Sequence, residues 1–216
     1  MTETTHSAAF DRPGVTLARA LPWLIAAAFL AVMPFVFTSN SAITIMNQMA
    51  ITIIFALSYN MLLGQGGMLS FGHAVYMGVG GFLCVHIMNW DQFFGILPLP
   101  LLPIFGGLFG MGLALIVGAF STRRAGTVFA MISLGVGELI AACSVIIVVF
   151  FGGEEGISGD RTYGLPVFGI EFLSQIEVYY LTAFWLVLSA LLMFLFSRTP
   201  VGRMANAVRD NPERAE

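Results

Sequence analysis

Two polar side chains in an otherwise apolar chain could do chemistry on a substrate. Ser70 and His73 lie three residues apart, so they share a face if the segment is helical, as a nucleophile and its base would. A hydrolase also needs an orienting acid and a sharp turn at the nucleophile, and this segment has neither. We therefore keep a membrane-embedded hydrolase using Ser70 and His73 as an alternative only, and we expect that the protein is not an enzyme.

The residues around this pair, "GQGGMLSFGHAVYMGVGG" at 64–81, are rich in glycine and include Gln65. Close packing explains part of this composition, because small residues let helices approach each other. Glu138 is the only acid well inside an apolar run, where a charge costs at least ~2.5–3.5 kcal/mol. Its carboxyl group either lines a transport route or forms a hydrogen bond between helices, and both interpretations stay open.

The composition indicates a membrane protein. The chain of 216 residues is 58% hydrophobic and 10% charged, whereas a soluble domain has about 45–50% and about 25%. It has arginine but no lysine and a net charge of −3, which argues against nucleic acid as a partner and against a polybasic lipid anchor. The sequence contains no Walker loop and no metal-ligand motif. If the protein uses ATP, another chain must bind it.

Six apolar runs have about the length of 20 residues that a helix needs to cross a bilayer. We expect an all-α bundle of about six transmembrane spans at residues 20–37, 43–63, 68–88, 96–120, 127–151 and 178–196. Arginines cluster before the first run, between the fourth and fifth, and after the sixth. Because basic loops stay in the cytoplasm, six crossings predict that both terminal segments, 1–19 and 198–216, are cytoplasmic.

The second and third runs are separated only by residues 64–67. These residues form either a tight turn at the inner surface or part of a broken or re-entrant helix. Non-helical backbone at membrane depth is stable only where protein or a water-filled cavity satisfies its polar groups. The second alternative would therefore indicate a permeation path.

The last residues, "SRTPVGRMANAVRDNPERAE", predict a short amphipathic helix. Thr199 can cap it and Pro200 suits its first position. An apolar stripe then faces away from the arginines; it consists of Val201, Met204, Ala205 and Val208. Such a helix can lie on lipid or fit a groove on a soluble partner.

Four segments resemble, in this order, parts of the LivM-type inner-membrane permeases of branched-chain amino acid ABC transporters. They are "YNMLLGQGGMLSFGHAVYMGVGGF", "GTVFAMISLGVGELI", "FFGGEEGISG" and "SRTPVGRMANAVRDNPERA". The resemblance implies a multi-pass protein of the bacterial inner membrane that works with a second homologous permease, two cytoplasmic ATP-binding subunits and a periplasmic substrate-binding protein. It implies no cofactor of its own, and branched-chain amino acids, related small amino acids or amides such as urea as substrates.

The polar residues discussed above and the resemblance together predict two sets of functional residues. The substrate-pathway set combines the glycine-rich segment with the acid in the fifth run: Asn60, Gln65, Gly66, Ser70, His73 and Glu138. The ATPase-coupling set lies in the terminal segment: Gly202, Arg203, Ala207, Arg209, Asn211, Glu213, Arg214 and Ala215. Members of the family continue past this motif with more helices, so we expect that the chain is truncated. A non-transporting membrane scaffold is therefore a further alternative.

Overall fold

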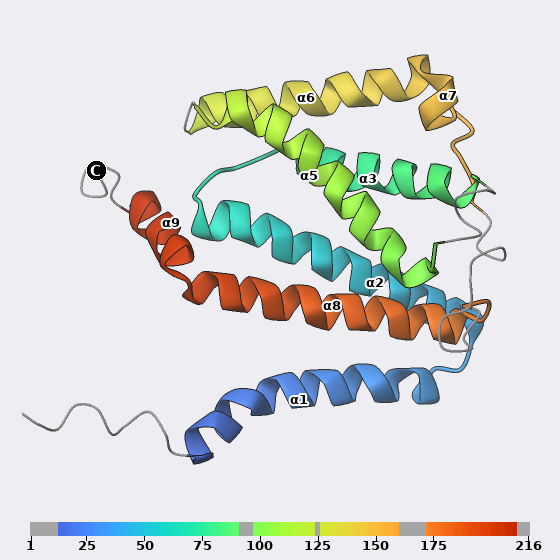
Figure 1. The fold of residues 1–216 in the computed structure, drawn as a ribbon, viewed down its shortest axis with the longest axis vertical. Helices are drawn as coiled ribbons and strands as arrows, with labels where there is room; N and C mark the ends of the chain where they lie inside the picture. The colour runs from blue at the N-terminus through green and yellow to red at the C-terminus, as the bar shows by residue number, and fades with distance from the viewer. Residues whose placement is uncertain (1–12, 91–96, 124–125, 160–171, 211–216) are drawn as a thin grey trace, which may run out of the picture.

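The computed structural model describes residues 13–90, 97–123, 126–159 and 172–210, and it contains helices but no strand in these ranges (Figure 1). This confirms the predicted all-α polytopic bundle. Four helices within these ranges are long and apolar enough to cross a membrane: Asn40–Gln65, Leu99–Ser121, Thr127–Ile146 and Gln175–Arg198. Two shorter apolar helices accompany them, Leu21–Val36 and His73–Met88.

The first group of helices contains α1 (Pro13–Val36), α2 (Asn40–Asn60) and α8 (Gln175–Arg198). Helix α8 packs against both of the others. The Tyr179 hydroxyl donates a hydrogen bond of 2.9 Å to the Leu30 carbonyl, which joins α8 to α1. Side chains from α2 and α8 form the buried core of the group: Ile43, Tyr179 and Ala183. Large side chains thus hold this group together.

The second group contains α3 (His73–Met88), α5 (Leu102–Ser121), α6 (Thr127–Ile146) and the short α7 (Val148–Phe151). A 3-10 turn, η2 (Leu99–Leu101), leads into α5. Where α3 ends and α5 begins, Ile87 and other apolar residues form a core; the others are Leu97, Leu99, Leu102 and Phe172.

Helices α3 and α5 cross with their backbones in close approach. A Cβ atom placed on Gly80 would lie 2.6 Å from the Gly106 carbonyl oxygen. One placed on Gly110 would lie 2.9 Å from the Tyr76 carbonyl oxygen. Both distances are too short for a real side chain, so the contact requires glycine at these positions. Small residues on α5 therefore allow the two helices to pack this closely.

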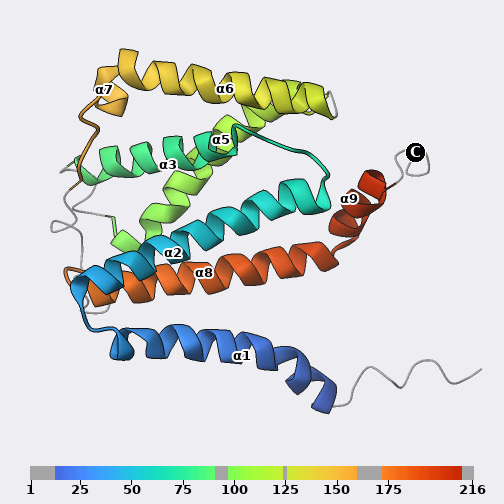
Figure 2. The same ribbon diagram turned by 180° about the vertical axis from the view of Figure 1, so that it is seen from behind.

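The glycine-rich segment carries the chain from the first group to the second. The π-helical turn η1 (Met61–Gln65) extends α2, and residues 66–72 are then non-helical until α3 begins at His73 (Figures 1 and 2). Helix α3 has 16 residues, so it spans only about 24 Å, less than the ~30 Å hydrocarbon core. Helix α3 thus begins five residues after the start of the predicted span 68–88, and the non-helical residues before it fit the broken-helix alternative.

Two other predicted boundaries also differ from the structure. The first helix begins at Pro13, seven residues before the predicted span 20–37. The run 127–151 breaks at Ile147, whose backbone angles of −93° and 70° are not helical, so that α6 and α7 are separate. The break lies within a series of five β-branched residues, 145–149, and such residues have low helix propensity.

The last helix, α9 (Pro200–Asp210), follows α8 directly. Thr199 caps it as predicted, because its Oγ1 accepts a 3.2 Å hydrogen bond from the Gly202 N–H. In both views α9, the start of α1 and the end of α5 lie at the same end of the bundle (Figures 1 and 2). Arginines cluster in or beside these segments in the sequence; the number of membrane crossings stays a prediction. We call this end the inner end and the opposite end the outer end.

Candidate functional site

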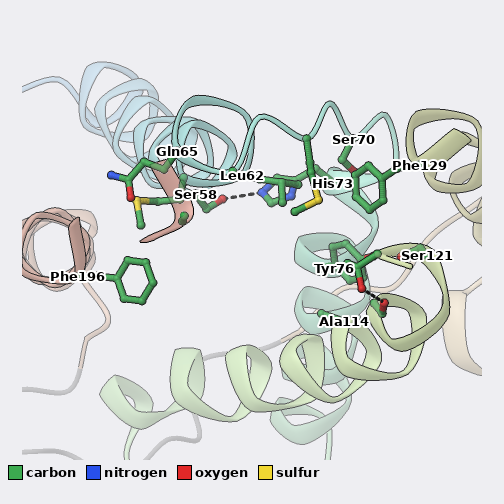
Figure 3. Close-up of a pocket in the computed structure, with 16 residues that line it drawn as sticks. Ser58, Leu62, Gln65, Ser70, His73, Tyr76, Ala114, Ser121, Phe129 and Phe196 are labelled. Carbon is green, nitrogen blue, oxygen red and sulfur yellow. Dashed lines mark hydrogen bonds between the residues drawn. The ribbon is translucent and has the colours of Figure 1, made fainter. Parts of the chain in front are cut away.

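Two cavities lie between the two groups of helices. The inner cavity, of about 420 Å³, is lined on one side by η1 and the ends of α8 and α9 and on the other by α5 (Figure 3). The outer cavity, of about 590 Å³, lies between α2 and the crossing of α3 and α5. Both volumes fall in the range of roughly 300–1,000 Å³ that is typical of small-molecule sites.

The two cavities adjoin and share part of their wall, which we call the neck. Four residues line both of them, and these define the neck: Ser58, His73, Tyr76 and Ala114. Ser58 Oγ and His73 Nε2 are 2.8 Å apart, and this hydrogen bond joins α2 to the start of α3 (Figure 3). The rings of Phe55 and Tyr59 also lie within 5.2 and 5.5 Å of the His73 ring centre. His73 therefore connects the two groups of helices at the point where the cavities join.

Four of the six predicted pathway residues line the inner cavity. They come from η1, from the non-helical segment and from the first position of α3: Gln65, Gly66, Ser70 and His73. Sequence reasoning missed Ser58, Tyr76 and Ala114. The spacing of Ser58 and Gln65, seven residues or about two helical turns, was a usable signal, because it places both on one face of α2 and its extension.

Asn60 and Glu138 lie outside both cavities. Asn60 is exposed, and its amide lies over Gly64, where an added Cβ atom would come within 2.6 Å of Oδ1. Glu138 is exposed on α6 and has no hydrogen-bonding partner in the part of the chain that the structure describes. Ser133 and Gly137 lie on the side of α6 that contacts the 66–72 segment. Glu138 lies on a different side of the helix, away from the cavities.

The geometry does not support the hydrolase alternative. Ser70 precedes α3, so Ser70 and His73 do not share a helical face. His73 Nε2 instead contacts Ser58, whose own hydroxyl hydrogen goes to the Phe55 carbonyl at 2.8 Å. None of the described residues that line either cavity is acidic. A nucleophile with a base and an orienting carboxylate is therefore not assembled here.

The non-helical segment is covered by protein. The Phe71 N–H donates a 3.0 Å hydrogen bond to Ser133 Oγ on α6. Gly72 packs so closely on the Ser133 carbonyl that a Cβ atom would overlap it. Gly66 and Gly67, the latter at φ +65°, donate their N–H groups to the Met61 and Leu63 carbonyls of η1. The preceding turn η1 and Ser133 on α6 thus satisfy part of this irregular backbone, which borders the inner cavity.

Small residues recur every four positions along α5, at Gly106, Gly110, Ala114 and Gly118. This stripe has two roles along its length. Gly106 and Gly110 contact the α3 backbone, as described above. Ala114 lines both cavities and Gly118 lines the inner one, where a Cβ atom on Gly118 would meet nothing within 4 Å. The outer half of the stripe therefore packs helices, and the inner half leaves open space.

Helix α9 contacts the glycine-rich turn directly. The Arg209 guanidinium donates to the Gly64 carbonyl, and the Arg209 side chain lies against Gly67, where a Cβ atom would be 2.6 Å from Cγ. Arg203 is exposed. On the apolar side of α9, Val201 and Met204 are 61% and 63% exposed, whereas Ala205 lines the inner cavity.

The other predicted coupling residues are placed as follows. Gly202 is buried where α9 meets the end of α8, and a Cβ atom there would overlap the Phe196 carbonyl. Ala207 is exposed on α9. Four further predicted coupling residues lie outside the described ranges: Asn211, Glu213, Arg214 and Ala215.

Comparison with known proteins supports one family. No curated protein and no solved structure matches the chain. A family model described as the permease component of branched-chain amino acid transport systems matches residues 41–216, which is most of the chain. This confirms the resemblance seen in the four sequence segments. The chain therefore belongs to the family of permease components of branched-chain amino acid transport systems.

Proposed function

We propose that the chain is a permease subunit of an ABC importer in the bacterial inner membrane, and that the two cavities are part of its translocation path. The substrates are branched-chain amino acids or related small amino acids and amides. The observation that carries the proposal is the neck: two cavities between two groups of helices meet at Ser58 and His73. A route across a membrane needs such a connection between its two sides.

The lining of the outer cavity suits an aliphatic side chain. Apolar residues from α2, α3 and α5 form most of it, including Ile51, Ile54, Phe55, Met77 and Met111. Apolar surface gains roughly 25 cal/mol per Å² when it leaves water, so a branched side chain is favoured there over a polar one. No charged residue lines this cavity within the described part of the chain.

Transport in this proposal is a rocking of the two helix groups about the neck. The main helix contacts fall within each group, so each can move as a unit while the cavities open in turn. Helix α9 acts as the coupling element. Its exposed apolar stripe fits a groove on an ATP-binding subunit, and Arg209 passes the movement to the glycine-rich turn through Gly64.

Further subunits complete the transporter in this proposal. Two cytoplasmic ATP-binding subunits bind the nucleotide, a periplasmic protein delivers substrate, and a second permease lies beside this chain. The exposed position of Glu138 favours a second permease, rather than lipid, as the neighbour of α6. A carboxyl group halfway along an apolar helix is costly against hydrocarbon, and a neighbouring protein can offer it a hydrogen-bond donor.

Uptake of radiolabelled leucine tests this proposal. Cells that lack the gene should lose ATP-dependent uptake, and the intact gene should restore it. The His73→Ala variant should insert normally and restore little uptake, because the neck loses its link between helix groups. Uptake that is unchanged without the gene would contradict the proposal. A chain that never co-purifies with an ATP-binding subunit would instead favour the scaffold alternative.

A further inference from the structure

Two buried acceptor atoms in the inner cavity have no partner. Gln65 Oε1 and His73 Nδ1 are both shielded from solvent, and neither accepts a hydrogen bond within the described part of the chain. Both residues line the inner cavity. A buried polar atom without a partner costs about 1–3 kcal/mol, so a movement that uncovers either acceptor to a hydrogen-bond donor in the cavity recovers this cost.

The hydrogen-bond pattern at the neck fixes the chemistry of His73. The Ser58 hydroxyl donates its hydrogen to the Phe55 carbonyl at 2.8 Å. Both contacts of Ser58 are satisfied when Oγ accepts at its 2.8 Å contact with His73, and on this basis we assign the hydrogen of the imidazole to Nε2. In the neutral imidazole this leaves Nδ1 as a lone-pair acceptor. Gln65 Oε1 is a carbonyl oxygen and is also an acceptor.

We propose that Gln65 Oε1 and His73 Nδ1 are two successive binding positions for the ammonium group of an aliphatic amino acid. Figure 3 shows the His73 ring beside Ser58 and Gln65 apart from that ring, and both residues line the inner cavity. One ammonium group thus meets the two acceptors in turn as it moves along the inner cavity. This inference rests on the proposed transport function and adds the part of the substrate that is recognised there.

Neutral acceptors suit a transport route better than a carboxylate would. A transport site must bind its substrate well enough to admit it and weakly enough to release it. The cavity linings contain no acid and no arginine among the described residues, so the ammonium group makes charge-assisted hydrogen bonds without forming a salt bridge. Such bonds are about twice as strong as those between neutral groups.

Equilibrium binding of radiolabelled leucine to the purified transporter complex, without its substrate-delivery protein, tests this inference. We expect Gln65→Leu to weaken binding by about 10-fold or more, since a hydrogen bond to a charged group is lost. Gln65→Glu should tighten it, because the acceptor becomes an anion. Asn60→Leu is the matched control: it removes a side-chain amide from the end of the same helix, outside both cavities.

Competing ligands identify the group that is recognised. 3-Methylbutylamine, which keeps the ammonium group of leucine but lacks its carboxylate, should displace leucine. 4-Methylpentanoate, which keeps the carboxylate but lacks the ammonium group, should not. Equal displacement by both compounds, a Gln65→Leu complex that binds as tightly as the unaltered one, or an unaltered complex that binds no leucine would overturn the inference. None of these results would affect the uptake test, so the two proposals fail separately.

Ser58 tests the role of the imidazole tautomer. In Ser58→Ala, Nε2 loses its acceptor, so the hydrogen can move to Nδ1 and turn this atom into a donor. Leucine binding should weaken by about 10-fold, the loss of one charge-assisted bond. Ser58→Thr keeps a hydroxyl and should restore binding. If Ser58→Ala and Ser58→Thr bind leucine equally, the assignment of Nδ1 as an acceptor is wrong.

Discussion

The two groups of helices are held together in different ways. In the first group, large side chains make the contacts, and Tyr179 on α8 donates to the backbone of α1. In the second, backbone meets backbone, because Gly80 and Gly106 leave no space between α3 and α5. The first mode tolerates repacking of flexible side chains, whereas the second does not. The second group is therefore the more rigid body. The cavities lie between the two groups.

The largest effect is expected from a methyl group placed in the glycine contact. Gly80→Ala should destabilise the protein by about 1–3 kcal/mol, because its Cβ atom would press on the Gly106 carbonyl. Gly112→Ala on α5 is the control, since a Cβ atom there meets nothing within 4 Å. Alanine in a helix should make this control neutral or slightly more stable. Thermal unfolding in detergent measures both, and equal melting temperatures would show that the contact is not tight.

A somewhat smaller loss of stability is expected where Ser133 on α6 contacts the non-helical segment 66–72. Ser133→Ala should cost about 1–2 kcal/mol, because the Phe71 N–H then loses its acceptor. Hydrogen exchange of residues 66–72 should speed up in the same variant. Ser144→Ala is the control, as this serine is only partly buried and bonds only within its own helix. Unchanged exchange in Ser133→Ala would mean that the segment is held by other contacts.

The side-chain contacts of the first group should be more tolerant. Tyr179→Phe removes a hydrogen bond to the Leu30 carbonyl, and bonds of this kind contribute about 0.6 kcal/mol on average in membrane proteins. Tyr180→Phe should cost less, because its contact with the Ala31 carbonyl is longer, at 3.4 Å, and exposed. Unfolding measurements that place Tyr179→Phe at or above the cost of Gly80→Ala would reverse the comparison between the groups.

The smallest effect on stability is expected at α9, where function should change instead. Arg209→Ala lies at the surface and should alter the free energy of unfolding by less than about 0.5 kcal/mol. Leucine uptake should nevertheless fall while the ATP-binding subunit still co-purifies, because the link to Gly64 is lost. Arg203→Glu together with Arg209→Glu should abolish co-purification itself. Full uptake by Arg209→Ala would show that the contact between Arg209 and Gly64 is not part of the coupling mechanism.

Hydropathy and local chemistry predicted much of the fold. The apolar runs give the long helices within a few residues, since 20 apolar residues have one stable form in a bilayer. Thr199 and Pro200 specify the start of α9 locally, and the structure has it there. Gln65, Ser70 and His73 stood out because polar residues are rare in such a chain, and they line the inner cavity.

The features that sequence could not give depend on distant contacts. The helix break at 66–72 is stabilised by Ser133, sixty-two residues further along the chain from Phe71. Ser58 resembles any helical serine until His73 is known to lie beside it. Glu138 was expected either to line a transport route or to form a hydrogen bond between helices, but it is exposed on α6 and lies outside both cavities. Hydrophobic periodicity does not report which helix faces which.

The reaction of a cavity thiol with a charged, membrane-impermeant reagent tests most directly whether a water-filled route lies between the two helix groups. In a background with Cys84→Ser and Cys143→Ser, Ala114→Cys lies at the neck and the adjacent Leu115→Cys lies outside both cavities. In the assembled transporter, Ala114→Cys should react, leucine should slow this reaction, and Leu115→Cys should stay unmodified. Equal reactivity of the two thiols, or no protection by leucine, would contradict the proposed route.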